Sequence, residues 1–111
     1  MDNKIVGSDL DGTFLEHTEL WGITDLIITG NSWEIASGVM EELGRTDIPV
    51  FFNTVKSGEE NLSNIVAHKA DIIKKVGVIR FFEDQQQQVN LLQALCPNCK
   101  IIQVFENRTA I

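Results

Sequence analysis

Near the start of the chain stands Ile5-Val6-Gly7-Ser8-Asp9-Leu10-Asp11-Gly12-Thr13, a short apolar run that leads into two aspartates and a glycine. The apolar run is continuous, which predicts a strand over residues 5–7 that is covered on both faces. In an extended segment, residues i and i+2 point the same way, so the two carboxylates are expected to lie side by side. Like charges that close need a cation, or one of them stays protonated. The pair is the arrangement for a magnesium ion held by a few carboxylates and a phosphate. An acidic turn with Asp-Gly at its tip is common, however, and the pair by itself favours that turn.

Four more apolar runs follow the first, and they too are continuous rather than alternating. They predict strands over residues 26–29, 50–53, 78–82 and 101–105. Helical patterns lie between most of these strands. Such alternation predicts a parallel sheet with helices on both faces. The expected fold is therefore α/β, a Rossmann-like three-layer α/β/α sandwich with a five-stranded parallel sheet, formed by a single domain over residues 1–111.

Three helical patterns separate the strands. The first ends at Gly44 and the second at Gly77, because glycine is the usual C-terminal cap. The second pattern, over residues 59–76, fits either one helix or two, and a third stripe lies over residues 89–95. Two capping boxes are expected at the helix starts, namely Asn31 with Glu34 and Ser57 with Glu60.

The composition bounds the class of protein. Of the 111 residues, 43% are hydrophobic and 23% charged, which is typical of one globular domain that buries a core without disulfides. The apolar runs are too short for a membrane span or a signal peptide, so a cytoplasmic protein is expected. The net charge of −7 disfavours a nucleic-acid partner, because phosphate contacts need clustered Lys and Arg. A phosphate bound locally, or through a divalent cation, is compatible with this charge.

Polar residues that directly follow the strands are the candidates for a site, because ligands of parallel sheets bind at the carboxyl ends of the strands. Thr29-Gly30-Asn31 follows the second strand, and Glu83-Asp84 follows the fourth. Lys69 lies on the apolar stripe of the second helical pattern, where an inward-facing lysine needs an anionic partner such as Asp9. Each of these has a structural interpretation as well: a turn, an acidic helix start, and a lysine whose stem covers apolar surface.

The quoted pentapeptide Asp9-Leu10-Asp11-Gly12-Thr13, after its apolar strand, resembles motif I of the haloacid-dehalogenase-like (HAD) phosphohydrolase superfamily, a D-x-D-G-T signature. The resemblance covers nearly the whole chain, since Thr29 fits motif II, Lys69 fits motif III and Glu83-Asp84 fits a paired-acid form of motif IV. It implies a magnesium-dependent phosphatase that hydrolyses a phosphomonoester through an aspartyl-phosphate. A carboxylate nucleophile is chemically reasonable because it splits one phosphoryl transfer into two.

The resemblance also implies a role for each residue. Four residues are expected to be catalytic, namely Asp9 as nucleophile, Asp11 as general acid and base, Thr29 as a ligand of the phosphoryl oxygens, and Lys69 as the motif III lysine. The substitutes for Lys69 are Lys56 and Lys74. The residues implied in phosphate binding are Leu10, Gly30 and Asn31, and those implied in binding Mg²⁺ are Asp9, Asp11, Glu83 and Asp84. Gln88 stands where the longer form of motif IV has a later Asp, so that form is absent.

The chain leaves no room for the cap domain that many HAD enzymes carry. Only residues 14–24 separate motif I from the second strand, enough for a turn and a small hairpin. The stretch over residues 54–75 has a helical pattern and no extra strand. The expected site is therefore open, which suits a macromolecular phosphorylated substrate or a homo-oligomer whose neighbour covers the mouth.

Two other functions share part of this pattern. A non-catalytic HAD-like module for binding or regulation would keep the fold and the reduced motif IV. A receiver-type signalling domain also has about five parallel strands, an acidic pair, a phosphorylated Asp, a Thr and a Lys, but in a different order along the chain.

Two smaller groups of residues favour structural roles. Cys96 and Cys99 form a single Cys-Pro-Asn-Cys, which predicts a turn before a strand, because a zinc site normally needs four ligands. His17, Trp21 and Trp33, near the expected mouth of the site, are more typical of packing than of substrate contact.

Overall fold

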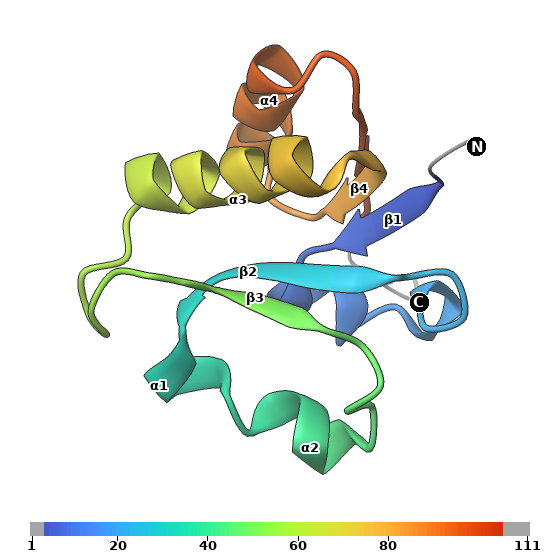
Figure 1. The fold of residues 1–111 in the computed structure, drawn as a ribbon, viewed down its shortest axis with the longest axis vertical. Helices are drawn as coiled ribbons and strands as arrows, with labels where there is room; N and C mark the ends of the chain where they lie inside the picture. Colours follow the sequence, from blue (N-terminus) through green and yellow to red (C-terminus); the bar gives the residue numbers. More distant parts are fainter. Residues whose placement is uncertain (1–3, 106–111) are drawn as a thin grey trace, which may run out of the picture.

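The computed structural model describes residues 4–105 and contains one five-stranded sheet in which every strand pair is parallel (Figure 1). Its strands are β1 (Ile5–Ser8), β2 (Leu26–Ser32), β3 (Val50–Asn53), β4 (Val78–Glu83) and β5 (Lys100–Gln103). The five expected strands are all present, so the prediction of a Rossmann-like α/β fold with a five-stranded parallel sheet is confirmed. The first, second and fourth extend one to three residues further than expected, and the fifth ends earlier.

The strand order across the sheet is β3-β2-β1-β4-β5. The chain therefore starts in the middle, builds outward through β2 and β3, and returns to build β4 and β5 on the other side. In open sheets of this kind, the crevice at the point where the order reverses is the usual ligand site. Here that point lies at the carboxyl ends of β1 and β4.

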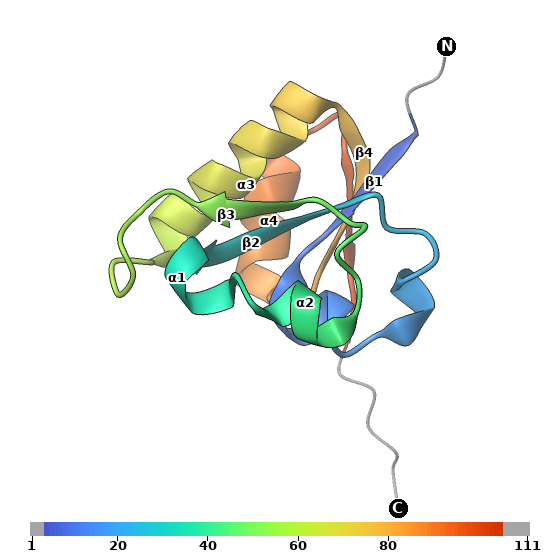
Figure 2. The same cartoon turned by 60° about the horizontal axis from the view of Figure 1, so that its bottom comes forward.

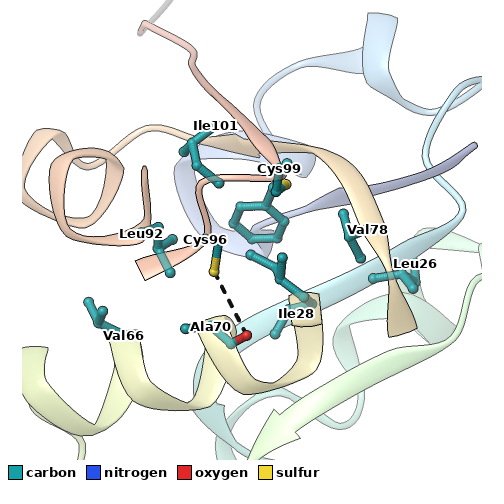
Figure 3. Close-up of a cluster of buried hydrophobic side chains, with 11 residues drawn as sticks. Leu26, Ile28, Val66, Ala70, Val78, Leu92, Cys96, Cys99 and Ile101 are labelled. Carbon is teal, nitrogen blue, oxygen red and sulfur yellow. Dashed lines mark hydrogen bonds between the residues drawn. The ribbon is translucent and has the colours of Figure 1, made fainter. Parts of the chain in front are cut away.

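Two long helices pack on one face of the sheet, α3 (Leu62–Val76) and α4 (Gln86–Leu95). Figure 3 shows the apolar cluster that they share with the strands. The short helices α1 (Trp33–Ala36) and α2 (Val39–Leu43) lie on the opposite side (Figure 2). A second cluster there joins α1 and α2 to Ile27 of β2 and to Leu10 and Phe14, which follow β1.

Cys96 and Cys99 are both buried in the cluster of Figure 3, at the turn that leads into β5. The thiol of Cys96 donates to the carbonyl oxygen of Ala70 at 3.8 Å, and burial raises the pKa of Cys99 to about 12. Thiols so held act as small apolar side chains. The interpretation of this pair as a turn before a strand is confirmed.

The first helical pattern forms two short helices rather than one, with a break between Ala36 and Val39. The expected capping box of Asn31 with Glu34 is wrong. β2 continues through Asn31, and its register against β3 shifts so that Ser32 pairs with Asn53. The C-terminal cap at Gly44 is confirmed by its left-handed backbone, φ 75°.

The second helical pattern is a single helix, α3, which starts later than expected. Its capping box pairs Asn61 with Asn64, and not Ser57 with Glu60. Glu60 instead accepts from the backbone N–H groups of Gly58 and Ser32, which ties the loop before α3 to the end of β2.

The connections at the carboxyl edge of the sheet are short. Two helical turns, η1 (Leu10–Phe14) and η2 (Thr18–Leu20), occupy the space between β1 and β2 where a small hairpin was expected. A loop over residues 54–61 joins β3 to α3. In the part of the chain that the structure describes, no helix combines the length and apolar character needed to cross a membrane.

Candidate active site

Three carboxylates meet where β1 and β4 end. The backbone N–H of Asp9 donates to the carbonyl oxygen of Phe82 at 2.9 Å, which fixes the end of β1 against β4. Glu83 is the last residue of β4 and Asp84 follows it. One oxygen from each of Asp9, Glu83 and Asp84 lies within 4.8 Å of the others. The carboxyl ends of two adjacent parallel strands therefore bring three acidic groups together at one place.

Lys69 reaches this point from α3 and is 1% exposed. Its Nζ donates to Asp9 Oδ1 at 2.9 Å, to Glu83 Oε1 at 2.7 Å and to Gln88 Oε1 at 2.7 Å. A lysine ammonium has three protons, so each has a partner. The contact with Asp9 that the sequence indicated for an inward-facing lysine is confirmed. Asp9, Lys69, Glu83 and Asp84 are called the acid–lysine cluster below.

Burial and charge compete within this cluster. Burial raises the pKa of Asp9 above its ordinary value, and Lys69 opposes that rise. Burial and the neighbouring charge of Asp9 raise the pKa of Glu83 to about 8. Burial by itself would lower the pKa of Lys69, but the charges of Asp9 and Glu83 outweigh it and raise that pKa. One cation therefore faces more negative charge than it neutralises, and the cluster favours either a bound proton or a further cation.

Gly12 and Thr13 hold the first turn after β1 against Asp84. Gly12 has φ 75°, and a Cβ there would collide with the Asp84 carboxylate, so glycine is required. The Thr13 hydroxyl lies 3.3 Å from Asp9 Oδ2 and 3.1 Å from Asp84 Oδ1. It bridges the two carboxylates and keeps their oxygens on one side of the site.

Asp11 does not join the three carboxylates at the strand ends. The backbone turns after Asp9, with the N–H of Phe14 donating to the Asp9 carbonyl oxygen at 3.1 Å, so the expectation for an extended segment is wrong here. Asp11 is exposed, and its Oδ2 accepts from Asn31 Nδ2 at 2.5 Å. It lies at the mouth of the site rather than at its base.

Residues in the second half of β2 form one wall, since β2 extends to Ser32 and includes Thr29, Gly30 and Asn31. The Oγ1 of Thr29 accepts from the backbone N–H of Asn31 at 3.1 Å, which leaves the hydroxyl proton of Thr29 to donate elsewhere. Gly30 packs under Ile65 of α3, because a Cβ at Gly30 would lie 2.7 Å from Ile65 Cγ2. Leu10 has its side chain in the apolar core, so only its backbone is available to a phosphate.

These residues line a small cavity of about 150 Å³ that is open to solvent at its mouth. Its lining comprises Asp9, Asp11, Thr29, Gly30, Asn31, Ile65, Lys69, Asp84, Gln85 and Gln88. Seven of the nine predicted site residues thus line one cavity; Leu10 does not, and Glu83 does not but accepts a hydrogen bond from Lys69. Of the three candidate lysines only Lys69 lines it, since Lys56 lies in the 54–61 loop and Lys74 lines a separate hollow beside Cys96.

Trp21 and His17, near the mouth, have structural surroundings, whereas Trp33 does not. Trp21 stacks on Phe14, with ring centroids 5.7 Å apart, and His17 is buried with its Nδ1 3.1 Å from Glu19. Trp33 is exposed. Three residues that line the cavity had no site role in the sequence analysis, namely Ile65, Gln85 and Gln88. The signal for Gln88 was its place where the longer form of motif IV has an Asp, four residues after Asp84.

The sequence matches no family model, and neither a curated protein nor a solved structure matches it. The case for a function therefore rests on the geometry of the cavity and on the motif resemblance.

Proposed function

We propose that the protein is a magnesium-dependent phosphatase that hydrolyses a phosphomonoester through an aspartyl-phosphate on Asp9. The observation that carries this proposal is the buried contact of 2.9 Å between Lys69 and Asp9 at the base of a small cavity. A lysine in that position keeps one carboxylate oxygen in place and neutralises part of its charge. The other oxygen of Asp9 does not contact Lys69 and lies 3.3 Å from the Thr13 hydroxyl, so it is the oxygen that would attack phosphorus.

The donor set fits a hard divalent cation. Carboxylate oxygens are the ligands that Mg²⁺ prefers, and it is usually held by one or two of them together with substrate phosphate. Asp9 and Asp84 would hold it best. Glu83 is less available, because its Oε1 accepts from Lys69 and its Oε2 from the backbone N–H groups of Asp84 and Gln85. Bound Mg²⁺ would offset the excess negative charge and attract the phosphoryl oxygens.

The residues around Asp9 divide the reaction into two displacements. An Asp9 oxygen attacks phosphorus, and the ester oxygen leaves with a proton from Asp11. Water then attacks the phosphorus of the aspartyl-phosphate, gives its proton to Asp11 and releases phosphate and the free Asp9 carboxylate. Asn31, which donates to Asp11, holds it at the mouth where the leaving group sits. The Thr29 hydroxyl donates to a phosphoryl oxygen.

The two alternatives differ in what supports them. A binding module that uses the same cavity without turnover is favoured by the completeness of the Lys69 hydrogen bonds, which need no ligand. Receiver domains have the strand order 2-1-3-4-5, whereas here β1 lies between β2 and β4. The strand order therefore argues against a receiver.

The test is hydrolysis of a panel of phosphomonoesters with Mg²⁺ and with EDTA. Turnover is expected with Mg²⁺ and not with EDTA. The Asp9→Asn substitution should abolish it. The Asp11→Asn substitution should lower it about 10²–10⁴-fold, with a smaller loss for substrates that have a good leaving group. The matched control is Asp71→Asn, which removes an exposed acid on α3. Full activity in EDTA, or in Asp9→Asn, would refute the proposal; binding of phosphate without turnover would favour the module.

A further inference from the structure

Gln88 lies on α4 and lines the cavity together with Asp9, Thr29 and Lys69. It is partly buried, and its Oε1 accepts from Lys69 Nζ at 2.7 Å, as short a contact as the one between Lys69 and Glu83. The proposed function gives Gln88 no role as nucleophile, general acid or cation ligand. Its position inside the cavity nevertheless gives it access to whatever binds there.

The orientation of this amide is dictated by its partner. An ammonium group only donates hydrogen bonds, so the amide oxygen of Gln88 must face Lys69 and the NH₂ end must face away from it. The other two protons of Lys69 are occupied by Asp9 and Glu83. No acceptor for Gln88 Nε2 is found within residues 4–105. Gln88, oriented by Lys69, therefore presents a fixed pair of neutral donors at the cavity wall.

The charge of the cavity explains why neutral donors matter there. Asp9, Asp11 and Asp84 line it, and its single cation, Lys69, is already engaged with Asp9 and with buried Glu83. An incoming phosphoryl group is itself anionic, so each further carboxylate would repel it. A glutamate at position 88 would accept from Lys69 as well as glutamine does, but it would have no proton to donate and would add a negative charge.

We propose that Gln88 is a phosphate-binding residue: Lys69 orients its amide, and Nε2 donates to an oxygen of the phosphoryl group that sits over Asp9. This rests on the proposed function for the identity of the ligand. Gln88, from α4, thereby joins Thr29 of β2 as an uncharged donor that lines the same cavity.

Binding of inorganic phosphate in the presence of Mg²⁺, measured by titration calorimetry, tests the proposal without any turnover. Loss of a hydrogen bond to a charged group should weaken binding about ten- to hundredfold in Gln88→Glu, and Gln88→Ala should weaken it too. The control is Gln87→Glu, which makes the same charge change on the exposed neighbouring residue and should leave the affinity within about twofold.

Phosphate affinity that is kept in Gln88→Glu would overturn the proposal, because the glutamate still accepts from Lys69 but has no proton to donate and adds a repelling charge. The two roles that Gln88 could have are separated by its Nε2 proton signals, which respond to phosphate only if Nε2 donates to it. Should either variant fail to fold, the wild-type protein still decides, because the Nε2 proton signals of Gln88 in a ¹⁵N NMR spectrum should shift when phosphate is added. Unshifted signals, or no phosphate binding by the wild type, would overturn it.

The outcome for Gln88 is distinguishable from that for the phosphatase. Phosphate binding that depends on Gln88, with no hydrolysis of any ester, would keep this inference and reject the enzyme. Hydrolysis by the wild type, together with an unchanged phosphate affinity in Gln88→Glu, would keep the phosphatase and reject the role of Gln88.

Discussion

Lys69 is a charged side chain buried almost completely, and its three partners come from β4, α4 and the residue after β1. Removing one partner of a buried ion pair leaves the other charge without compensation, which typically costs about 3–5 kcal/mol. Lys69→Met should lower the free energy of unfolding by about that much, measured by urea denaturation at pH 7 without added metal.

The control for this change is Lys75→Met, on the same helix. Lys75 pairs with Asp71 at 3.0 Å, but both side chains are exposed, and surface pairs contribute little. Equal destabilisation by the two substitutions would mean that the buried cluster has no special part in stability.

Glu83 gives the metal-free protein a pH dependence whose sign follows from its raised pKa. The folded protein keeps the Glu83 proton up to about pH 8, whereas the unfolded chain loses it near 4.5. Between these values the folded state binds the extra proton, so raising the pH lowers stability. In EDTA, Tm should fall as the pH rises from 5 to 8, and Mg²⁺ should restore more stability at pH 8 than at pH 5.

The variant that isolates this effect is Glu83→Gln, which keeps a side chain of the same shape without a titrating proton. Its Tm in EDTA should change less with pH over the same range. A slope equal to that of the wild type would assign the dependence to another group.

At the level of single residues, the sequence was informative where a strand end fixes the position of a side chain. Asp9, Asp84 and Lys69 converge in one cavity, because the strand ends and the apolar stripe of a helix locate them. Asp11 was misplaced because the i, i+2 rule holds only while the chain stays extended. Gln88 was given no role, because it stands where the longer form of motif IV has an Asp and an uncharged amide does not fit that motif.

Among the elements, the packing of α3 on β2 sets the depth of the site. Ile65 lies one helical turn before Lys69 and packs directly over Gly30, where a Cβ would come within 2.7 Å of it. Gly30→Ala should therefore push α3 outward and cost about 1–3 kcal/mol, as overpacking does. It should also weaken phosphate binding, because Lys69 moves with the helix.

A double-mutant cycle with Ile65→Ala checks this prediction. The smaller side chain makes room for the added methyl group, so Gly30→Ala should cost less in the Ile65→Ala background than in the wild type. Additive effects in urea denaturation would show that the two residues do not compete for space.

The elements themselves were better predicted than their ends. Continuous apolar runs located all five strands, and the glycines located the ends of α2 and α3. The helix starts were missed because tertiary contacts took the expected caps: Asn31 stays in β2, and Glu60 binds backbone N–H groups of the loop and strand. A cap made by two asparagines, as at Asn61, has no acidic residue to mark it.

For the whole molecule, the feature with consequences for substrate choice is the openness of the cavity. The connections after β1 and β3 are short and add no domain over it in the described residues 4–105. Binding energy from remote parts of a substrate normally supplies orientation and rate. A small free phosphate ester should thus have a lower kcat/KM than a phosphorylated peptide or other large substrate, with the mass in solution measured alongside. High efficiency of a monomer on a small ester would contradict this.

Because the site lies where β1 meets β4, it forms during folding only after β4 has paired with β1. Thr13 and Asp84 are 71 positions apart, and Lys69 is 60 positions from Asp9. Closing loops of that length is a late and slow event in folding. A nascent chain still lacking its last two strands holds Asp9 and Lys69 but not Glu83, Asp84 or Gln88. Phosphate affinity is thus a reporter of completed folding, and in a refolding experiment it should return no earlier than the final strand pairing.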